Sequence, residues 1–378
     1  MLYELLAWLN EQYSPPGFDA FDFITTRTAF AAATALIISL IIGKSIINWL
    51  GRMQLKETIR EDIGLDMHLS KADTPTMGGV IIILATLIPA ALWMDMFSVY
   101  TWMSIFVVLS LGVVGFLDDY IKVVMKNKSG LHGWVKIFGQ VFAGGVLGAT
   151  LYFWPAFDEF NTITTVPFLK EVHIDYAFFT TEYAWLIYIP VVILVITAVS
   201  NAANLTDGLD GLLTGTSAIA GVILGIFAYV SGRTDFSSFL NIMYLPGAGE
   251  LTIFAASMVG ACLGFLWYNS YPASVFMGDT GSLALGGALG ALAIMIHKEL
   301  LLPVICGIFV VEALSVIIQT TWFKYSRWKY GEPRRIFLMA PIHHHFEKLG
   351  WPESKITVRF WIIAILLGII SLLTLKLR

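Results

Sequence analysis

Long apolar runs recur along the whole chain, and shorter polar segments separate them. A transmembrane helix needs about 20 consecutive residues that are predominantly apolar. By this criterion the pattern predicts about ten spans, near residues 26–49, 77–95, 99–117, 135–154, 183–200, 211–230, 250–268, 281–297, 300–323 and 358–376. The sequence therefore predicts an all-α polytopic membrane protein, with one integral membrane domain over residues 1–378.

Composition excludes a soluble protein. Only 13% of the 378 residues are charged, whereas 57% are hydrophobic. Soluble domains carry about 25% charged residues, so this chain has too few charges to cover a water-facing surface. Cys262 and Cys306 both lie inside apolar runs. We interpret them as small buried hydrophobic residues and not as a disulfide.

Basic residues are concentrated on alternate loops. Cytoplasmic loops of membrane proteins carry an excess of Lys and Arg. Sixteen of the 23 basic residues fall on one set of loops, namely Arg52, Lys56, Arg60, Lys71, Lys122, Lys126, Lys128, Lys136, Lys324, Arg327, Lys329, Arg334, Arg335, Lys348, Lys355 and Arg359. These loops are predicted to be cytoplasmic. Because the number of spans is even, both termini are predicted to lie outside, on the periplasmic side.

The unusual polar motifs fall on the predicted cytoplasmic side. They are K-A-D-T-P-T-M-G-G at 71–79, F-L-D-D-Y at 116–120, N-A-A-N-L-T-D-G-L-D-G at 201–211, N-S-Y-P-A-S-V-F-M-G-D-T-G-S at 269–282 and A-P-I-H-H-H-F-E at 340–347. The outer loops contain nothing comparable. A transporter places its key groups near the midplane of the membrane, reachable from both faces. The one-sided distribution therefore favours catalytic loops that open to the cytoplasm.

Carboxylates and lysines recur in and near these motifs. The carboxylates are Asp118, Asp119, Asp207, Asp210 and Asp279, and the lysines are Lys71, Lys122 and Lys136. Ionisable groups near the hydrocarbon edge are costly and tend to be functional, although the adjacent pair at 118–119 could equally be solvated loop acids. Mg²⁺ is typically held by one or two carboxylates and by phosphate oxygens of a substrate. The set therefore suggests a divalent cation with a phosphorylated substrate. No G-x-x-x-x-G-K-[ST] motif supports the use of ATP.

Three consecutive histidines, His343, His344 and His345, form the most unusual motif. Neighbouring side chains point about 100° apart on a helix, so three in a row cannot easily hold one metal ion. Donation to phosphate or nucleotide oxygens by one or two of them fits better, and a surface run without function stays open. Glu312, inside the ninth predicted span, either hydrogen-bonds between helices or lines the site. Phe276 could stack on a base or anchor the chain at the membrane interface.

Together, T-P-T-M-G-G, F-L-D-D-Y, N-A-A-N-L-T-D-G-L-D-G-L, F-M-G-D-T-G-S and M-A-P-I-H-H-H-F-E, in this order, resemble the phospho-N-acetylmuramoyl-pentapeptide transferase family of the polyprenyl-phosphate N-acetylhexosamine-1-phosphate transferase superfamily. The resemblance covers essentially the whole chain. It implies Mg²⁺-dependent transfer of phospho-MurNAc-pentapeptide from UDP-MurNAc-pentapeptide to undecaprenyl phosphate, which forms lipid I and UMP in peptidoglycan synthesis. It also implies ten spans in the bacterial cytoplasmic (inner) membrane and a homodimer. No nucleic-acid partner is expected.

The resemblance further implies a role for each matching residue. Asp279 would be the magnesium ligand, and Asp118 and Asp119 would be catalytic acids beside it. Either one of these two aspartates, with Asp118 as the first candidate, takes a proton from the lipid phosphate, or a covalent phospho-aspartate forms. The implied substrate-binding residues are Lys71, Thr76, Lys122, Lys136, Asn204, Asp207, Asp210, Asn269, Phe276, His343, His344 and His345.

Two departures and two other functions stay open. Asp73 stands where the family usually has Gly before T-P-T-M-G-G, which adds an anion near Lys71 and puts the local turn in doubt. The basic stretch 322–335 looks longer than usual and either lies on anionic headgroups or forms a solvated loop. The other functions are a sister transferase that uses UDP-GlcNAc and a cation-coupled transporter.

Overall fold

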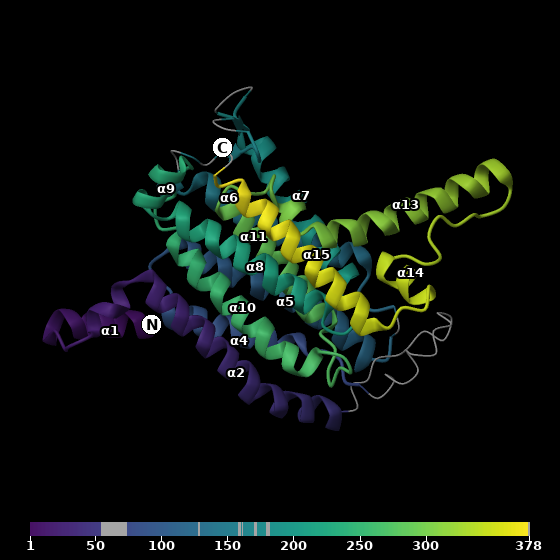
Figure 1. Ribbon diagram of the computed structural model, residues 1–378, viewed down its shortest axis with the longest axis horizontal. Helices are drawn as coiled ribbons and strands as arrows, with labels where there is room; N and C mark the ends of the chain where they lie inside the picture. The colour runs from purple at the N-terminus through teal and green to yellow at the C-terminus, as the bar shows by residue number, and fades with distance from the viewer. Residues whose placement is uncertain are drawn as a thin grey trace.

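The computed structural model describes residues 1–53, 74–127, 129–157, 160, 162–169, 172–178 and 182–376. Within them, the helices long and apolar enough to span a membrane are α2 (Ile24–Arg52), α5 (Val99–Val123), α6 (Gly133–Phe153), α7 (Trp185–Thr206), α8 (Leu212–Ser231), α10 (Gly249–Asn269), α11 (Gly278–Met295), α13 (Gly307–Tyr330) and α15 (Glu353–Leu373). A shorter apolar helix, α4 (Gly79–Trp93), packs among them. The predicted all-α polytopic membrane fold is confirmed (Figure 1).

Each of the ten predicted spans overlaps one of these helices, but two differ in length. With 15 residues, α4 is about 22 Å long, which is less than the hydrocarbon thickness of about 30 Å. The ninth predicted span is divided into α12 (Leu302–Ile305) and α13, with Pro303 in the first turn of α12. The second half of α13 then extends beyond the bundle and ends at Gly331, whose φ of 76° suits a glycine C-cap (Figure 1).

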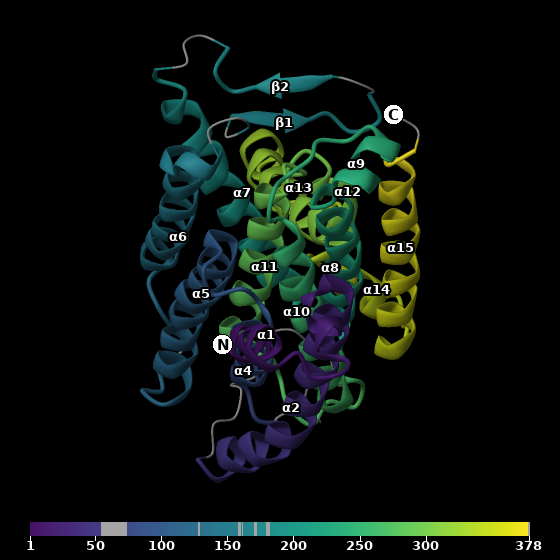
Figure 2. The same cartoon turned by 90° about the vertical axis from the view of Figure 1, so that its left-hand side faces the viewer.

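Several short elements were not predicted, because none has the length that the hydrophobic pattern was searched for. They are α1 (Leu2–Tyr13), the 3₁₀ turns Phe18–Asp22 and Pro155–Phe157, α9 (Thr234–Leu240), α14 (Ile342–Lys348), and the strands β1 (Ile163–Thr165) and β2 (His173–Asp175). The two strands pair antiparallel, with Ile163 opposite Asp175. Figure 2 shows this hairpin close to the C-terminus.

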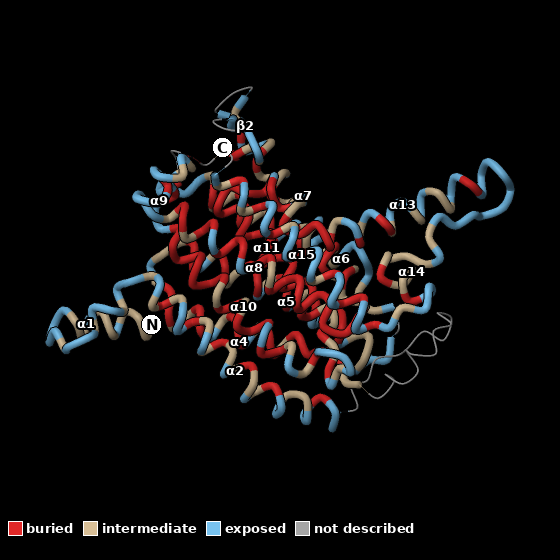
Figure 3. The backbone as a smooth tube through the Cα atoms, in the orientation of Figure 1, coloured by how far each residue is buried: buried red, intermediate tan, exposed pale blue. Residues whose placement is uncertain are grey.

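The core of the bundle lies around α11, which is rich in Gly and Ala and almost wholly buried (Figure 3). A Cβ at Gly287 would lie 2.2 Å from Leu111 on α5, and one at Gly286 would lie 2.6 Å from the Cα of Ser200 on α7. In lipid, helices associate chiefly through close van der Waals contact, which small residues permit. The small residues of α11 therefore allow α5 and α7 to approach from two sides and converge on its first turn.

The two ends of the bundle are different. At one end, here called the outer end, the N-terminal amine donates to the Ala91 carbonyl (3.1 Å), and Lys376 lies 4.2 Å from the centre of the Phe239 ring on α9. Both termini therefore lie at this end (Figure 1), as an even number of spans requires. The polar motifs lie at the opposite end, here called the motif end. The side of the membrane that each end faces stays a prediction.

Candidate active site

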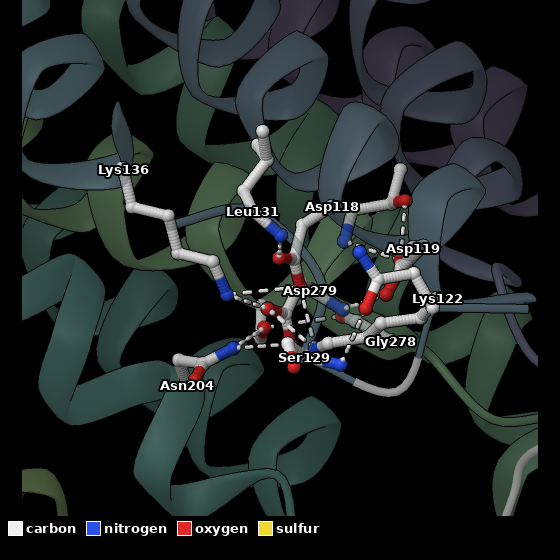
Figure 4. A network of polar contacts seen from close by, with 12 residues as sticks. Asp118, Asp119, Lys122, Ser129, Leu131, Lys136, Asn204, Gly278 and Asp279 are labelled. Carbon is white, nitrogen blue, oxygen red and sulfur yellow. Dashed lines mark hydrogen bonds and ion pairs between the residues drawn. The ribbon is translucent and has the colours of Figure 1, made fainter. Parts of the chain in front are cut away.

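Three carboxylates converge at the motif end. Asp118, Asp119 and Asp279 each offer an oxygen atom within 4.8 Å of the others (Figure 4). Asp118 and Asp119 lie inside α5, which continues to Val123, and their exposed fractions are 0% and 4%. The alternative that this pair consists of solvated loop acids is therefore wrong.

Two glycines make this convergence possible. A Cβ at Gly115 would lie 2.1 Å from the Asp279 carbonyl oxygen, so only glycine lets α5 pass this close to the start of α11. Gly278 has a φ of 72°, in the left-handed region that glycine adopts without strain. The chain can therefore turn sharply into α11 and place Asp279 in its first turn. Gly278 belongs to the motif at 269–282, and Gly115 directly precedes the motif at 116–120.

Two lysines neutralise most of the negative charge. The Lys122 Nζ atom lies 2.5 Å from Asp118 Oδ2 and 3.2 Å from Asp279 Oδ2. The Lys136 Nζ atom, which comes from α6, lies 2.8 Å and 2.5 Å from the same two oxygens. The four side chains thus form a compact square of alternating charge. Because Asp119 adds a third carboxylate, the formal charge of the cluster is negative by one.

Asn204 and a backbone amide orient the two carboxylates that face the lysines. The Asn204 Nδ2 atom donates to Asp279 Oδ1 and to Ser282 Oγ, both at 2.9 Å. The Leu131 amide donates to Asp118 Oδ1 (2.7 Å) from the loop between α5 and α6. Because α7 continues to Thr206, Asn204 lies on a helix and not in the predicted loop. These bonds leave the second oxygen of each carboxylate to face the cations.

Asp119 has different partners. Its Oδ1 accepts from the Asp279 amide (3.1 Å), and its Oδ2 accepts from the Thr280 amide (2.9 Å) and the Thr280 hydroxyl (2.6 Å). Thr76, 5% exposed, lies beside this contact, because a Cβ at Gly278 would approach both Asp119 and Thr76. The adjacent aspartates of α5 therefore point to two different sets of donors.

Asp210 and Asn269 belong to a second buried network, in which each is 3% exposed. The Asn269 Oδ1 atom accepts from the Gly211 amide (3.2 Å), and its Nδ2 donates to the Val275 carbonyl (3.0 Å). The Asp210 Oδ2 atom accepts from the Ala273 amide (2.9 Å). These two residues, both predicted to bind substrate, hold the loops at 207–211 and 270–276 together.

Of the predicted residues Asp207, Phe276 and Lys71, the structure describes the first two. Asp207 is the C-terminal cap residue of α7, and Phe276 is half-buried, with its amide donating to the Pro75 carbonyl (2.9 Å). Lys71, like Asp73, lies outside the described residues. Of the predicted substrate-binding residues, the structure therefore places Lys122, Lys136, Asn204 and Thr76 beside the aspartates.

The three histidines lie on α14 and make three separate contacts. The His343 Nδ1 atom lies 3.1 Å from Glu312 Oε2, and both side chains are fully buried. His344 Nδ1 lies 2.6 Å from Glu347 Oε2, and His345 Nδ1 accepts from the Leu338 amide (3.1 Å). Among the described residues, the three aspartates are grouped closely enough to hold a metal ion, and the three histidines are not. Glu312 thus connects α13 to α14.

Comparison with known proteins now assigns the family. The profile of Glycosyl transferase family 4 matches residues 101–297, which include all three aspartates. The Phospho-N-acetylmuramoyl-pentapeptide-transferase signature 1 matches residues 71–83. The chain is 49% identical to the Phospho-N-acetylmuramoyl-pentapeptide-transferase of Flavobacterium psychrophilum, 51% identical to that of Salinibacter ruber and 52% identical to that of Chloroherpeton thalassium. Each alignment covers 100% of both chains.

This chain belongs to the phospho-N-acetylmuramoyl-pentapeptide-transferase family. The resemblance found in the sequence motifs is confirmed, and the chain is a multi-pass protein of the bacterial inner membrane. The departure at Asp73 does not prevent the match to the family signature. The alternative function, a cation-coupled transporter, is not supported, because relatives that align over their full length are named as transferases.

The donor set of this transferase fits a divalent cation. Carboxylate oxygens are the ligands that hard cations prefer, and Mg²⁺ needs only one or two of them together with phosphate oxygens of a substrate. The three aspartates, whose oxygens lie within 4.8 Å of one another, provide enough. The negative formal charge of the cluster favours an added cation, and Lys122 and Lys136 can exchange a carboxylate oxygen for a phosphate oxygen. The site can therefore accept both a metal ion and a phosphorylated substrate.

Two residues of the site were missed in the sequence. Thr280 and Ser282, one and three residues after Asp279, bond to Asp119 and Asn204. Their signal was present, because hydroxyl residues at the start of a helix often bond to neighbouring polar groups. Their partners, however, come from α5 and α7, which no local pattern identifies.

Proposed function

We propose that this chain transfers phospho-MurNAc-pentapeptide from UDP-MurNAc-pentapeptide to undecaprenyl phosphate, with Mg²⁺ as cofactor, and releases lipid I and UMP. Membership of the family carries the reaction and its place in peptidoglycan synthesis. The observation that carries the mechanism is the cluster of Asp118, Asp279, Lys122 and Lys136, in which two cations bridge two carboxylates.

The binding of the two substrates follows from charge. A diphosphate and a lipid phosphate both bring negative charge, so they need cations more than they need a strong base. Lys122 and Lys136 supply two ammonium groups, and phosphoryl transfer depends chiefly on such positioning and charge stabilisation. Both lysines lie near the end of a membrane helix, where a lipid phosphate at the membrane surface and a soluble nucleotide can meet.

The chemical step is attack by an oxygen of undecaprenyl phosphate on the β-phosphorus of the UDP-sugar. A new P–O bond forms, the P–O bond to UMP breaks, and UMP leaves with the bridging oxygen. Asp118 accepts the proton that the lipid phosphate loses, with its other oxygen held by the Leu131 amide. Asn204 holds the Asp279 carboxylate toward the reacting phosphates.

Asp279 is the residue that would hold Mg²⁺, beside Asp118, which accepts the proton. When bound, the ion would neutralise charge on the diphosphate and on the departing UMP. The same residues prepare the site without it, because the lysines keep the two carboxylates in place.

Residue roles beyond the cluster are further proposals. His344 and His345, Asp207, Phe276, Thr76 and Lys71 would contact the nucleotide-sugar, and His343, Asp210 and Asn269 would shape the loops that hold it. We treat residues 1–378 as one transferase domain, which the continuous buried core supports. The family resemblance also leads us to expect a homodimer.

The test is a reconstituted assay. Purified protein in lipid nanodiscs is given Mg²⁺, UDP-MurNAc-pentapeptide and undecaprenyl phosphate, and both UMP and lipid I are measured. We expect equimolar UMP and lipid I, and neither product from Asp279→Asn. Absence of UMP from the wild-type protein would contradict the transferase function.

A second arm tests the sugar. UDP-GlcNAc replaces the muramoyl nucleotide under the same conditions, and little or no UMP is expected. Turnover of UDP-GlcNAc alone would instead assign the chain to the sister transferases.

A further inference from the structure

The first turn of α11 needs a cap that its own sequence does not provide. The first amides of any α-helix have no partner inside the helix, and a Ser, Thr, Asp or Asn side chain usually accepts from them. In α11 the N-cap position is Met277, and no side chain of this residue caps the helix. The turn carries Asp279, so whatever caps it also positions Asp279.

Asp119 takes the place of that cap from another helix. Its two oxygens accept the amides of Asp279 and Thr280, at 3.1 Å and 2.9 Å, and the Thr280 hydroxyl at 2.6 Å. The carboxylate is 4% exposed, and it also meets the positive end of the α11 dipole. The contact joins residues 160 positions apart in the chain.

The neighbouring carboxylates have quite different surroundings. Asp118 and Asp279 each place an oxygen between two ammonium groups, which are exchangeable cations. Among the described residues, no Lys, Arg or His forms an ion pair with Asp119. A carboxylate offers about four acceptor positions, and three of those on Asp119 are filled by donors that belong to the helix.

We propose that Asp119 is a positioning residue that caps α11 from α5 and so fixes Asp279 for metal binding. It neither transfers a proton nor binds the metal. This inference rests on the proposed function for the role of Asp279, and it divides the D-D pair into one residue that reacts and one that holds its partner helix. Loss of a residue that orients a metal ligand typically weakens metal binding by about 10- to 100-fold.

The test measures Mn²⁺ binding to the purified, nanodisc-embedded protein by electron paramagnetic resonance, without substrates. Asp119→Asn replaces one acceptor oxygen by an NH₂ group that faces N–H donors. We expect its Mn²⁺ affinity to fall by about 10- to 100-fold. Asp279→Asn, which removes the proposed ligand itself, identifies the signal that belongs to this site.

Two variants perturb the cap without changing a carboxylate. A Cβ at Gly278 would lie 2.6 Å from Asp119 Oδ2, so Gly278→Ala displaces the cap and should weaken Mn²⁺ binding to a similar degree. Thr280→Val removes one donor to Asp119 and should weaken binding by a few-fold, whereas Thr280→Ser keeps the hydroxyl and should restore it. If Asp119 were itself a ligand, loss of the Thr280 donor would free an oxygen, and Mn²⁺ binding would stay equal or become tighter.

Turnover provides the second readout. With Asp119→Asn, raising the Mg²⁺ concentration should recover most of kcat, and the pH profile of kcat should match that of the wild type. A kcat that stays low at saturating Mg²⁺, with wild-type Mn²⁺ affinity, would assign Asp119 to the chemistry and overturn the proposal. If Asp119→Asn does not fold, the Thr280 pair decides alone. Failure of the proposed function would appear separately, as wild-type protein that binds Mn²⁺ and releases no UMP.

Discussion

Charged side chains are buried at both ends of the helix bundle, but the two sets differ in balance. At the outer end, Arg27 pairs with Glu250 at 2.8 Å, and the two side chains also bond to backbone at the Trp93 carbonyl and the Asp95 amide. At the motif end, three carboxylates lie together, and the two ammonium groups pair with only two of them, Asp118 and Asp279. A balanced pair with backbone partners stabilises the fold, whereas surplus charge of one sign leaves a place for a ligand.

The histidines show the same contrast. His297, near the outer end, is buried, with its Nδ1 atom 2.7 Å from the Ile163 carbonyl of β1. His344, at the motif end, is partly exposed and lies against Glu347. One imidazole therefore connects a strand to the bundle, and the other lies partly exposed among the polar motifs. Four predictions test this comparison, from the largest expected effect to the smallest.

The first prediction concerns the three carboxylates and two lysines at the motif end. Asp279→Asn and Asp118→Asn should each lower kcat by about 10³-fold or more, because each removes a carboxylate that faces the lysines. The unfolding temperature should change by only a few degrees, since the surplus negative charge falls. UMP release and thermal unfolding in detergent measure the two effects. Wild-type turnover in either variant would remove that residue from the site.

The second substitution acts on the balanced pair. Arg27→Met should destabilise the protein by about 3–5 kcal/mol, because it leaves the Glu250 carboxylate buried without its cation. The double variant Arg27→Met/Glu250→Leu should recover most of that loss. Turnover per folded molecule should stay the same in both. A large fall in kcat in well-folded protein would show that the outer end also serves catalysis.

The third prediction concerns pH at the outer end. Burial lowers the pKa of His297 to about 4, from an ordinary value near 6.5. Between these values the unfolded chain binds a proton that the folded chain does not, so stability falls as the pH is lowered from 6.5 to 4, by up to about 3 kcal/mol. Thermal unfolding of His297→Gln should lack this decrease.

A second titrating group, Glu299, lies two residues further along the chain, and its effect must be separated from that of His297. Burial raises the pKa of Glu299, which contributes the opposite pH dependence. Glu299 is unchanged in His297→Gln, so the difference between the two melting curves isolates the imidazole. Identical pH dependence in both proteins would show that His297 does not remain neutral in the folded state.

The smallest effect is expected on the histidine motif. His344→Ala should lower kcat/KM by about 100-fold, through loss of a hydrogen bond to substrate, while the unfolding temperature changes little. His343→Ala should act on stability instead, because it leaves Glu312 buried without its partner. Comparing the two variants in the same assay separates the roles. Equal effects on stability would contradict this division.

Near the site, the hydrophobic pattern predicted the ends of two helices too early. The pattern ended the third span at residue 117, because two aspartates follow. The helix continues to Val123, since Lys136 on α6 and the first turn of α11 compensate those charges. Asn204 was likewise placed in a loop because it follows the apolar run. It lies on α7, and its partner Asp279 comes from another helix. A local pattern contains no information on such partners.

The sequence by itself determined the membrane class, nearly all of the spans, and the motifs that carry the chemistry, because apolar length and residue type are local properties of the chain. It also identified the family. Only the tertiary structure decided which of the five candidate aspartates converge, and that Asp118 faces lysines while Asp119 caps α11. The reason is geometric, since adjacent residues on a helix point about 100° apart and meet whatever the neighbouring helices present.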